Sequence, residues 1–138
     1  MNFFVTKYYF VLIISLLFFQ NGFSQSKEKE LLLIQNVKDL MNSNTEQALN
    51  ITNLLLEKST ITDAEKIKIN FLAAKIYKMK GDYSNSLKFL FEEKKFNSSI
   101  DEKDNLLIEL EKINVLRELA LKEEANDLIN AIENNKNE

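Results

Sequence analysis

The sequence of 138 residues is long enough for one modest domain, and its 45% hydrophobic and 28% charged residues are typical of a globular protein. It contains no Cys and no His, which excludes disulfides and thiolate metal sites and removes the commonest general base. Its formal net charge of −3 argues against nucleic-acid binding, which depends on neutralising phosphates. Pro is absent and Gly occurs twice, so the composition favours helices over a β-rich fold with many tight turns.

Residues 1–24 have the three-part pattern of a secretory signal peptide. Lys7 supplies the positive region, Tyr8–Phe19 is almost entirely apolar, and Gly22 and Ser24 are the small residues before the expected cleavage site. Twelve helical residues extend about 18 Å, which is short of the roughly 30 Å core of a bilayer. We therefore expect export to a periplasm or secretion. The alternative is an uncleaved N-terminal anchor, the only arrangement in which we expect a membrane as a partner.

Residues 25–138 are expected to form a single all-α domain. Apolar residues recur at spacings of three and four from about Lys27 to Asn134, with no competing run of strict alternation. The expected helices cover residues 27–42, 44–58, 63–80, 83–97, 101–119 and 122–135.

The expected helix boundaries carry physical signals. Three segments match the capping box, in which a hydroxyl and a Glu carboxylate each accept a backbone N–H at the start of a helix: Ser43–Glu46, Thr62–Glu65 and Ser99–Glu102. Gly81 is expected to end the third helix in a left-handed conformation, with Asp82 capping the next. No breaker lies within residues 119–122, so one continuous helix over 101–135 is the alternative to two helices there.

The segment Tyr77–Leu87 resembles the centre of a tetratricopeptide (TPR) repeat. In that motif an aromatic residue lies near the end of the first helix, a Gly-Asp-Tyr turn follows, and a small residue opens the packed face of the second helix. The matching residues are Ala74, Tyr77, Gly81, Asp82, Tyr83 and Ser86. The sequence departs from the motif at Ala74 and Ser86, where Gly and Ala are usual, and no Pro closes the unit.

Ala48 and Ala125 resemble the same small position as Ser86, at separations of 38 and 39 residues, whereas the usual repeat is about 34. The resemblance implies a short right-handed solenoid of about three antiparallel hairpins, in units of about 27–60, 62–98 and 99–135. The layout also resembles the N-terminal sensor segment of bacterial regulators that join TPR-like repeats to a membrane helix and a helix-turn-helix domain. A sensor role is therefore one alternative function.

Arrays that resemble TPR repeats commonly bind peptides on the concave face formed by the first helix of each pair. The resemblance implies that this face is lined by Lys68, Phe71, Lys75, Lys78 and Met79 in the second unit and by Leu107, Leu110, Asn114 and Arg117 in the third. Its basic residues would attract an acidic segment or a terminal carboxylate of a partner protein. The alternative is that these Lys side chains are ordinary solvent-exposed residues.

The sequence shows no catalytic apparatus, since no Gly-rich loop is present and Ser, Lys and Glu are scattered over helical surfaces. The acids at 101–104 suit the first turn of a helix and lack the spacing of a calcium loop. We therefore expect a non-catalytic protein without metal or cofactor, whose partner is a protein or peptide. A homodimer is a further alternative, in which a stripe of residues would be buried against a second copy: Leu121, Ala125, Leu128 and Ile132.

Overall fold

The computed structural model describes residues 31–96 and 100–135, with the backbone alone for Glu93, Lys94 and Asn135. The expected signal peptide and its cleavage site lie outside the described residues. The chain divides after Gln35, and Asn36–Glu138 is the unit described below. Among the described helices, none has both the length and the apolar character needed to span a bilayer.

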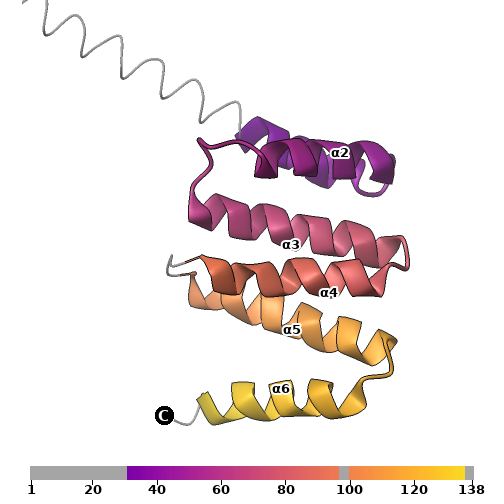
Figure 1. Cartoon of the computed structure of the whole chain (residues 1–138), viewed down its shortest axis with the longest axis vertical. Helices are drawn as coiled ribbons and strands as arrows, with labels where there is room; N and C mark the ends of the chain where they lie inside the picture. The colour runs from indigo at the N-terminus through magenta and orange to yellow at the C-terminus, as the bar shows by residue number, and fades with distance from the viewer. Residues whose placement is uncertain (1–30, 97–99, 136–138) are drawn as a thin grey trace, which may run out of the picture. The chain divides into compact units, whose positions relative to one another are not determined.

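The described residues are all helical apart from the turns between helices, and they contain no strand (Figure 1). Residues 31–40 are helical, and the following elements are α2 (Thr45–Leu56), α3 (Asp63–Met79), α4 (Tyr83–Phe91), the 3₁₀ helix η1 (Glu92–Lys95), α5 (Glu102–Glu118) and α6 (Lys122–Asn135). The predicted all-α class is therefore confirmed. From α2 to α6, each helix packs on the next one in sequence and runs antiparallel to it (Figure 1).

The prediction that the fourth helix continues to residue 97 is wrong. It ends at Phe91, and Glu92–Lys95 tightens into η1, which packs on α3. A 3₁₀ helix has about three residues per turn instead of 3.6, so it changes the direction in which the following side chains point. Phe96 thereby packs on the core formed by α3, α4 and α5, and the Nζ of Lys66 lies 5.6 Å from its ring centroid.

The alternative of one continuous helix over 101–135 is also wrong. The chain breaks at Ala120, whose φ of 60° is the one positive value among the described residues other than Gly. The N–H of Leu121 donates to the carbonyl of Leu116 at 2.9 Å, and the N–H of Ala120 donates to the carbonyl of Arg117 at 3.0 Å. This pair of bonds is a Schellman motif, which closes α5 without a Gly at the left-handed position.

The same motif closes α3. Gly81 has a φ of 75°, its N–H donates to the carbonyl of Lys78 at 2.9 Å, and the N–H of Asp82 donates to that of Tyr77 at 2.9 Å. Gly81 and Ala120 are 39 residues apart, the same separation as that between Ser86 and Ala125. The hairpins α3–α4 and α5–α6 therefore share the same turn, although only the first has the Gly that predicts it.

The helix starts confirm two of the expected caps. Thr62 and Glu65 form the reciprocal capping box, and the Asp82 carboxylate accepts the N–H of Asn85 at 3.1 Å. The box at Ser43 is wrong, because Asn44 is the N-cap and accepts the N–H of Gln47 at 3.2 Å. The box at residue 99 is wrong as well, because Asp101 is the N-cap of α5 and its side chain makes no capping bond.

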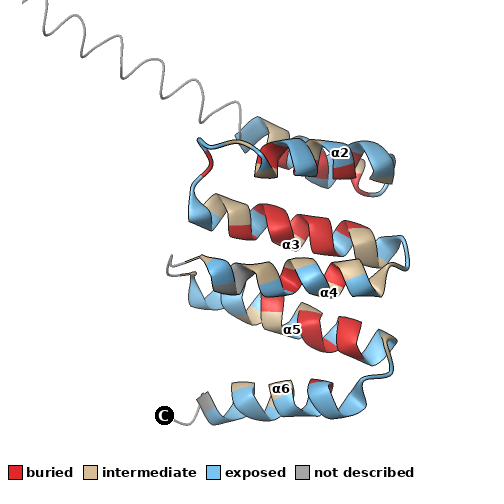
Figure 2. Cartoon of the chain, viewed as in Figure 1, coloured by how far each residue is buried: buried red, intermediate tan, exposed pale blue. Residues whose placement is uncertain are grey.

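The core is a row of small and aliphatic side chains between consecutive helices. One cluster joins α3, α4 and α5, and a second joins α5 and α6: the first contains Ile67, Ala74, Leu90, Ile108 and Val115, and the second contains Ile113, Leu116 and Ala125. Figure 2 shows buried residues along α3 and α5 and mostly exposed residues on α6. The central helices are thus covered from several sides, whereas α6 is covered mainly from one.

Candidate functional site

The residues that carry the repeat signature lie where helices approach each other. The hydroxyl of Ser86 donates to the carbonyl of Ala74 at 2.8 Å, and both residues are fully buried. Ala48 and Ala125 are also fully buried. Small side chains at these positions let neighbouring helix backbones come close together. Tyr77, from the first helix of its hairpin, stacks on Phe89 of the second with ring centroids 5.4 Å apart.

The predicted groove residues occupy one side of α3 and one side of α5, which we call the α3–α5 face. At about 100° per residue, Lys68, Lys75 and Met79 fall on one side of α3, opposite its buried row. On α5, Asn114 and Arg117 are exposed beside Leu107 and Leu110. The structure therefore places the two predicted rows on neighbouring exposed surfaces, while the binding role assigned to them stays a prediction.

Acidic residues of α5 neutralise two of the four basic residues on this face. The Nζ of Lys78 lies 3.0 Å from the Oε1 of Glu111, and the Nζ of Lys68 lies 3.7 Å from the Oδ2 of Asp104. The sequence predicts a basic groove or ordinary exposed Lys side chains here, and ion pairs between α3 and α5 reduce the positive charge that a ligand would meet. The Nζ of Lys75 lies 5.4 Å from the Phe71 ring centroid. The Lys75 side chain is exposed, so its charge faces solvent.

Large apolar side chains are the other feature of the α3–α5 face. Met79 is 51% exposed, Leu107 44% and Leu110 46%. Scattered exposed apolar residues are normal, but neighbouring ones on adjacent helices are typical of interaction surfaces. Arg117 also lines a cavity of about 340 Å³ at the turn between α5 and α6.

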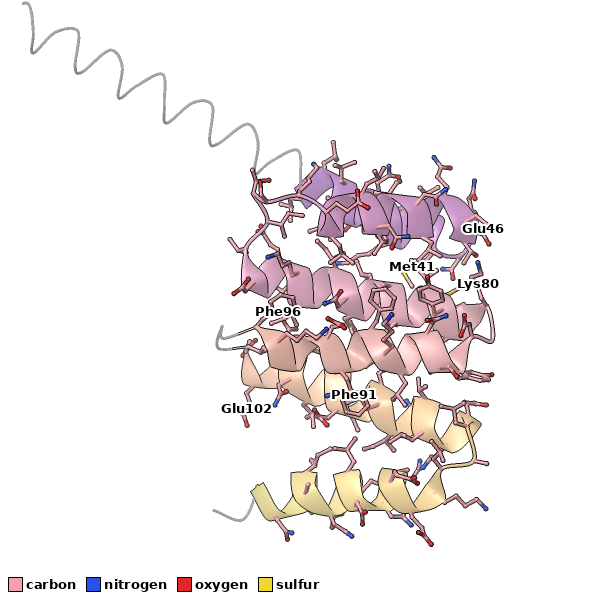
Figure 3. All side chains as sticks on the ribbon, viewed as in Figure 1. Met41, Glu46, Lys80, Phe91, Phe96 and Glu102 are labelled. Carbon is pink, nitrogen blue, oxygen red and sulfur yellow. The ribbon has the colours of Figure 1, made fainter. Side chains whose placement is uncertain are left out.

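A second cavity, which the sequence does not predict, lies on the other side of α3. It has a volume of about 400 Å³ and lies between the end of α2, the first half of α3 and the end of α4 with η1. Leu56, Phe89 and Phe96 supply its apolar lining, and Lys66, Lys88 and Glu92 supply its charged lining. Figure 3 shows Phe96 beside the end at which α3 begins.

The most buried residue of this cavity is Asn70, which is 5% exposed. Within the part of the chain that the structure describes, its side-chain amide has no hydrogen-bond partner. A buried amide without a partner costs about 1–3 kcal/mol of stability. A sequence signal existed, because Asn70 interrupts an apolar row at helical spacing between Ile67 and Ala74.

Among the described residues, Lys80 and Asp82 have shifted pKa values, and both lie at the turn between α3 and α4. Hydrogen bonds from the side chain and backbone of Asn85 lower the pKa of the Asp82 carboxyl. A hydrogen bond to Glu46 raises the pKa of the Lys80 ammonium, and Figure 3 shows these two side chains next to each other. Both shifts are explained by capping and by an ion pair between α2 and the end of α3, so they do not indicate catalysis.

The stripe considered for a homodimer is partly used within the chain. Ala125 is buried against Ile113 and Leu116 of α5, and Leu128 and Ile132 pack on the same cluster. Leu121 is 38% exposed and Leu128 and Ile132 are half-buried, so a homodimer through this stripe stays a prediction.

Among the described residues, no three Asp or Glu side chains lie close enough together to hold a metal ion. Comparisons of the chain with models of protein families, with curated proteins and with solved structures found no match. The case for a function therefore depends on the geometry of the chain itself.

Proposed function

We propose that this chain is an exported, non-catalytic module that binds a protein or peptide through TPR-like helical hairpins. The observation that carries the proposal is the recurrence of one hairpin design at a spacing of 39 residues. Schellman motifs at Gly81 and Ala120 are each followed five residues later by a buried small residue, Ser86 or Ala125. Stacked hairpins of this kind present extended surfaces on which other proteins bind.

The α3–α5 face is the proposed binding surface. Its exposed Met79, Leu107 and Leu110 can bury apolar side chains of a partner, and burial of apolar area supplies most of the free energy of such contacts. Lys75 and Arg117 then favour a partner with acidic residues next to its apolar ones. The proposal retains the acidic partner expected from the sequence but gives the larger energetic role to apolar contact.

The sharpest test is site-specific photo-crosslinking with the full chain in an exporting bacterial host. A photoreactive side chain at Leu110 should form an adduct with a partner protein, whereas the same group at the exposed Asn130 of α6 should not. Lys75→Glu should weaken the Leu110 adduct, and Lys88→Glu, which changes an exposed Lys of α4 away from this face, should leave it unchanged. Equal crosslinking at the two positions, or none at Leu110, would refute the proposal.

Lys78 is a poor choice for charge reversal. Its Nζ pairs with Glu111 across the two helices, so Lys78→Glu would place two carboxylates together and weaken the contact between α3 and α5. A loss of binding in that variant would report on the packing of the helices as much as on the partner.

A further inference from the structure

The cavity around Asn70 is open to solvent and contains a buried polar side chain. Its volume of about 400 Å³ falls at the lower end of the range for cavities that bind small ligands or single peptide side chains. It is lined by three apolar and three charged side chains and contains one deeply buried polar group, the Asn70 amide. Pockets with apolar walls and a few fixed polar groups are the usual arrangement for specific recognition.

The chemistry of Asn70 defines what it would bind. Its side chain has one carbonyl acceptor and one NH₂ donor, and neither is used within the described part of the chain. A peptide group has the matching N–H donor and C=O acceptor, so an extended peptide can form both bonds with one Asn side chain. Leu56, Phe89 and Phe96 provide apolar contacts for a neighbouring side chain of that peptide.

The charged residues of the cavity favour an acidic ligand. Glu92 is bonded to Lys95, with 2.6 Å between Oε1 and Nζ. Lys88 is exposed and forms no ion pair with any residue that the structure describes. The Nζ of Lys66 lies 3.5 Å from the Oδ1 of Asp63 in a partly exposed pair and 5.6 Å from the Phe96 ring centroid. An incoming carboxylate would therefore meet available positive charge, and Glu92 would repel it little.

We propose that the Asn70 cavity is a second peptide-binding site and that it takes an extended acidic segment carrying one large apolar side chain. The site is separate from the α3–α5 face, because Lys66 and Asn70 lie on the side of α3 roughly opposite to Lys68 and Lys75. It therefore goes beyond the proposed function, and either site can fail its test without the other.

The test uses the full chain labelled with ¹⁵N and two capped tetrapeptides, Glu-Leu-Gly-Glu and Lys-Leu-Gly-Lys. The side-chain amide signals of Asn70 are assigned by their loss in Asn70→Leu. Adding the acidic peptide should shift these signals, and adding the basic peptide at the same concentration should shift them far less. In Asn70→Leu, binding is followed through the backbone N–H signals of neighbouring residues. The affinity should fall about tenfold, because the hydrogen bonds of the Asn70 side chain are lost.

Two controls separate binding from folding. Asn130→Leu changes an exposed Asn on α6 and should leave binding of the acidic peptide unchanged. Asn70→Leu should raise the melting temperature, because it replaces a buried polar group without a partner by an apolar one that has space in the cavity. A raised melting temperature with weakened binding would identify Asn70 as a residue kept for recognition at the expense of stability.

A charge exchange keeps the proposal testable if Asn70→Leu does not fold. Lys88→Glu changes an exposed side chain. It should weaken binding of the acidic peptide and strengthen binding of the basic one. The proposal is overturned if the acidic peptide leaves the Asn70 signals in place at millimolar concentration, or if Lys88→Glu affects both peptides alike.

Discussion

Replacing Ala120 by Gly should stabilise the protein. Ala120 is held at a φ of 60°, where a Cβ atom costs about 1–2 kcal/mol through its clash with the backbone. Gly removes that cost, but it loses about 0.5–1 kcal/mol more conformational entropy on folding. The expected net gain is about 0.5–1 kcal/mol, which corresponds to a rise of roughly 3–6 °C in melting temperature for a domain of this size.

The matched variant is Gly81→Ala, at the same position of the other Schellman motif. A Cβ atom added there would meet no heavy atom within 4 Å, so the expected loss comes from the φ of 75° alone. We expect a loss of about 1 kcal/mol. Because the two turns are separate, the double variant should lie close to the sum of the single ones.

Urea denaturation followed by circular dichroism measures these changes as shifts in midpoint at constant slope. Ala131→Gly is the control, because this exposed residue lies within α6, where Gly should cost about 1 kcal/mol relative to Ala. The reasoning is refuted if Ala120→Gly destabilises the protein as Ala131→Gly does, or if Gly81→Ala leaves the midpoint unchanged.

Three further predictions use acid titration and the same denaturation assay. The pKa of Asp82 is lowered from 3.8. The contribution of Asp82 to stability is therefore complete above about pH 4 and is lost as the pH falls through the lowered pKa. Asp82→Asn should flatten this dependence of stability on acid pH. Ser86→Leu should cost roughly 1–3 kcal/mol by overpacking the contact between α3 and α4, whereas Ser84→Leu, at an exposed site, should change stability little. Glu109→Gln should cost roughly 2 kcal/mol, because the buried Nζ of Lys112 lies 2.8 Å from the Glu109 carboxylate; an unchanged midpoint would contradict this.

The positions of most helices follow from local patterns in the sequence. Spacings of three and four predict the helices, and Thr62 and Asp82 mark two of their starts through hydrogen bonds that local sequence specifies. The end of α5 was harder to predict, because Ala120 adopts a conformation that its own preferences disfavour. The surrounding packing imposes that conformation, whereas the residue type alone predicts that the helix continues, because Ala favours helices.

The candidate sites were less predictable than the helices. The exposed row on α3 follows from helical spacing, but the pairing of Lys68 with Asp104 joins residues of different hairpins, so spacing along one helix could not reveal it. The Asn70 cavity depends on η1, because Phe96 reaches its place only after the helix tightens at Glu92–Lys95. No residue in that segment signals a change from an α to a 3₁₀ helix.

The unequal covering of the helices has a kinetic consequence. α3 is packed between α2 and α4, whereas α6 packs mainly on α5 through one cluster of aliphatic side chains. Opening α6 therefore exposes less apolar surface than opening α3. The amides of α6 should exchange with solvent through local fluctuations, whereas those of α3 should exchange only through global unfolding. The chain should lose its order from the C-terminal hairpin inward, with α3 the last helix to open.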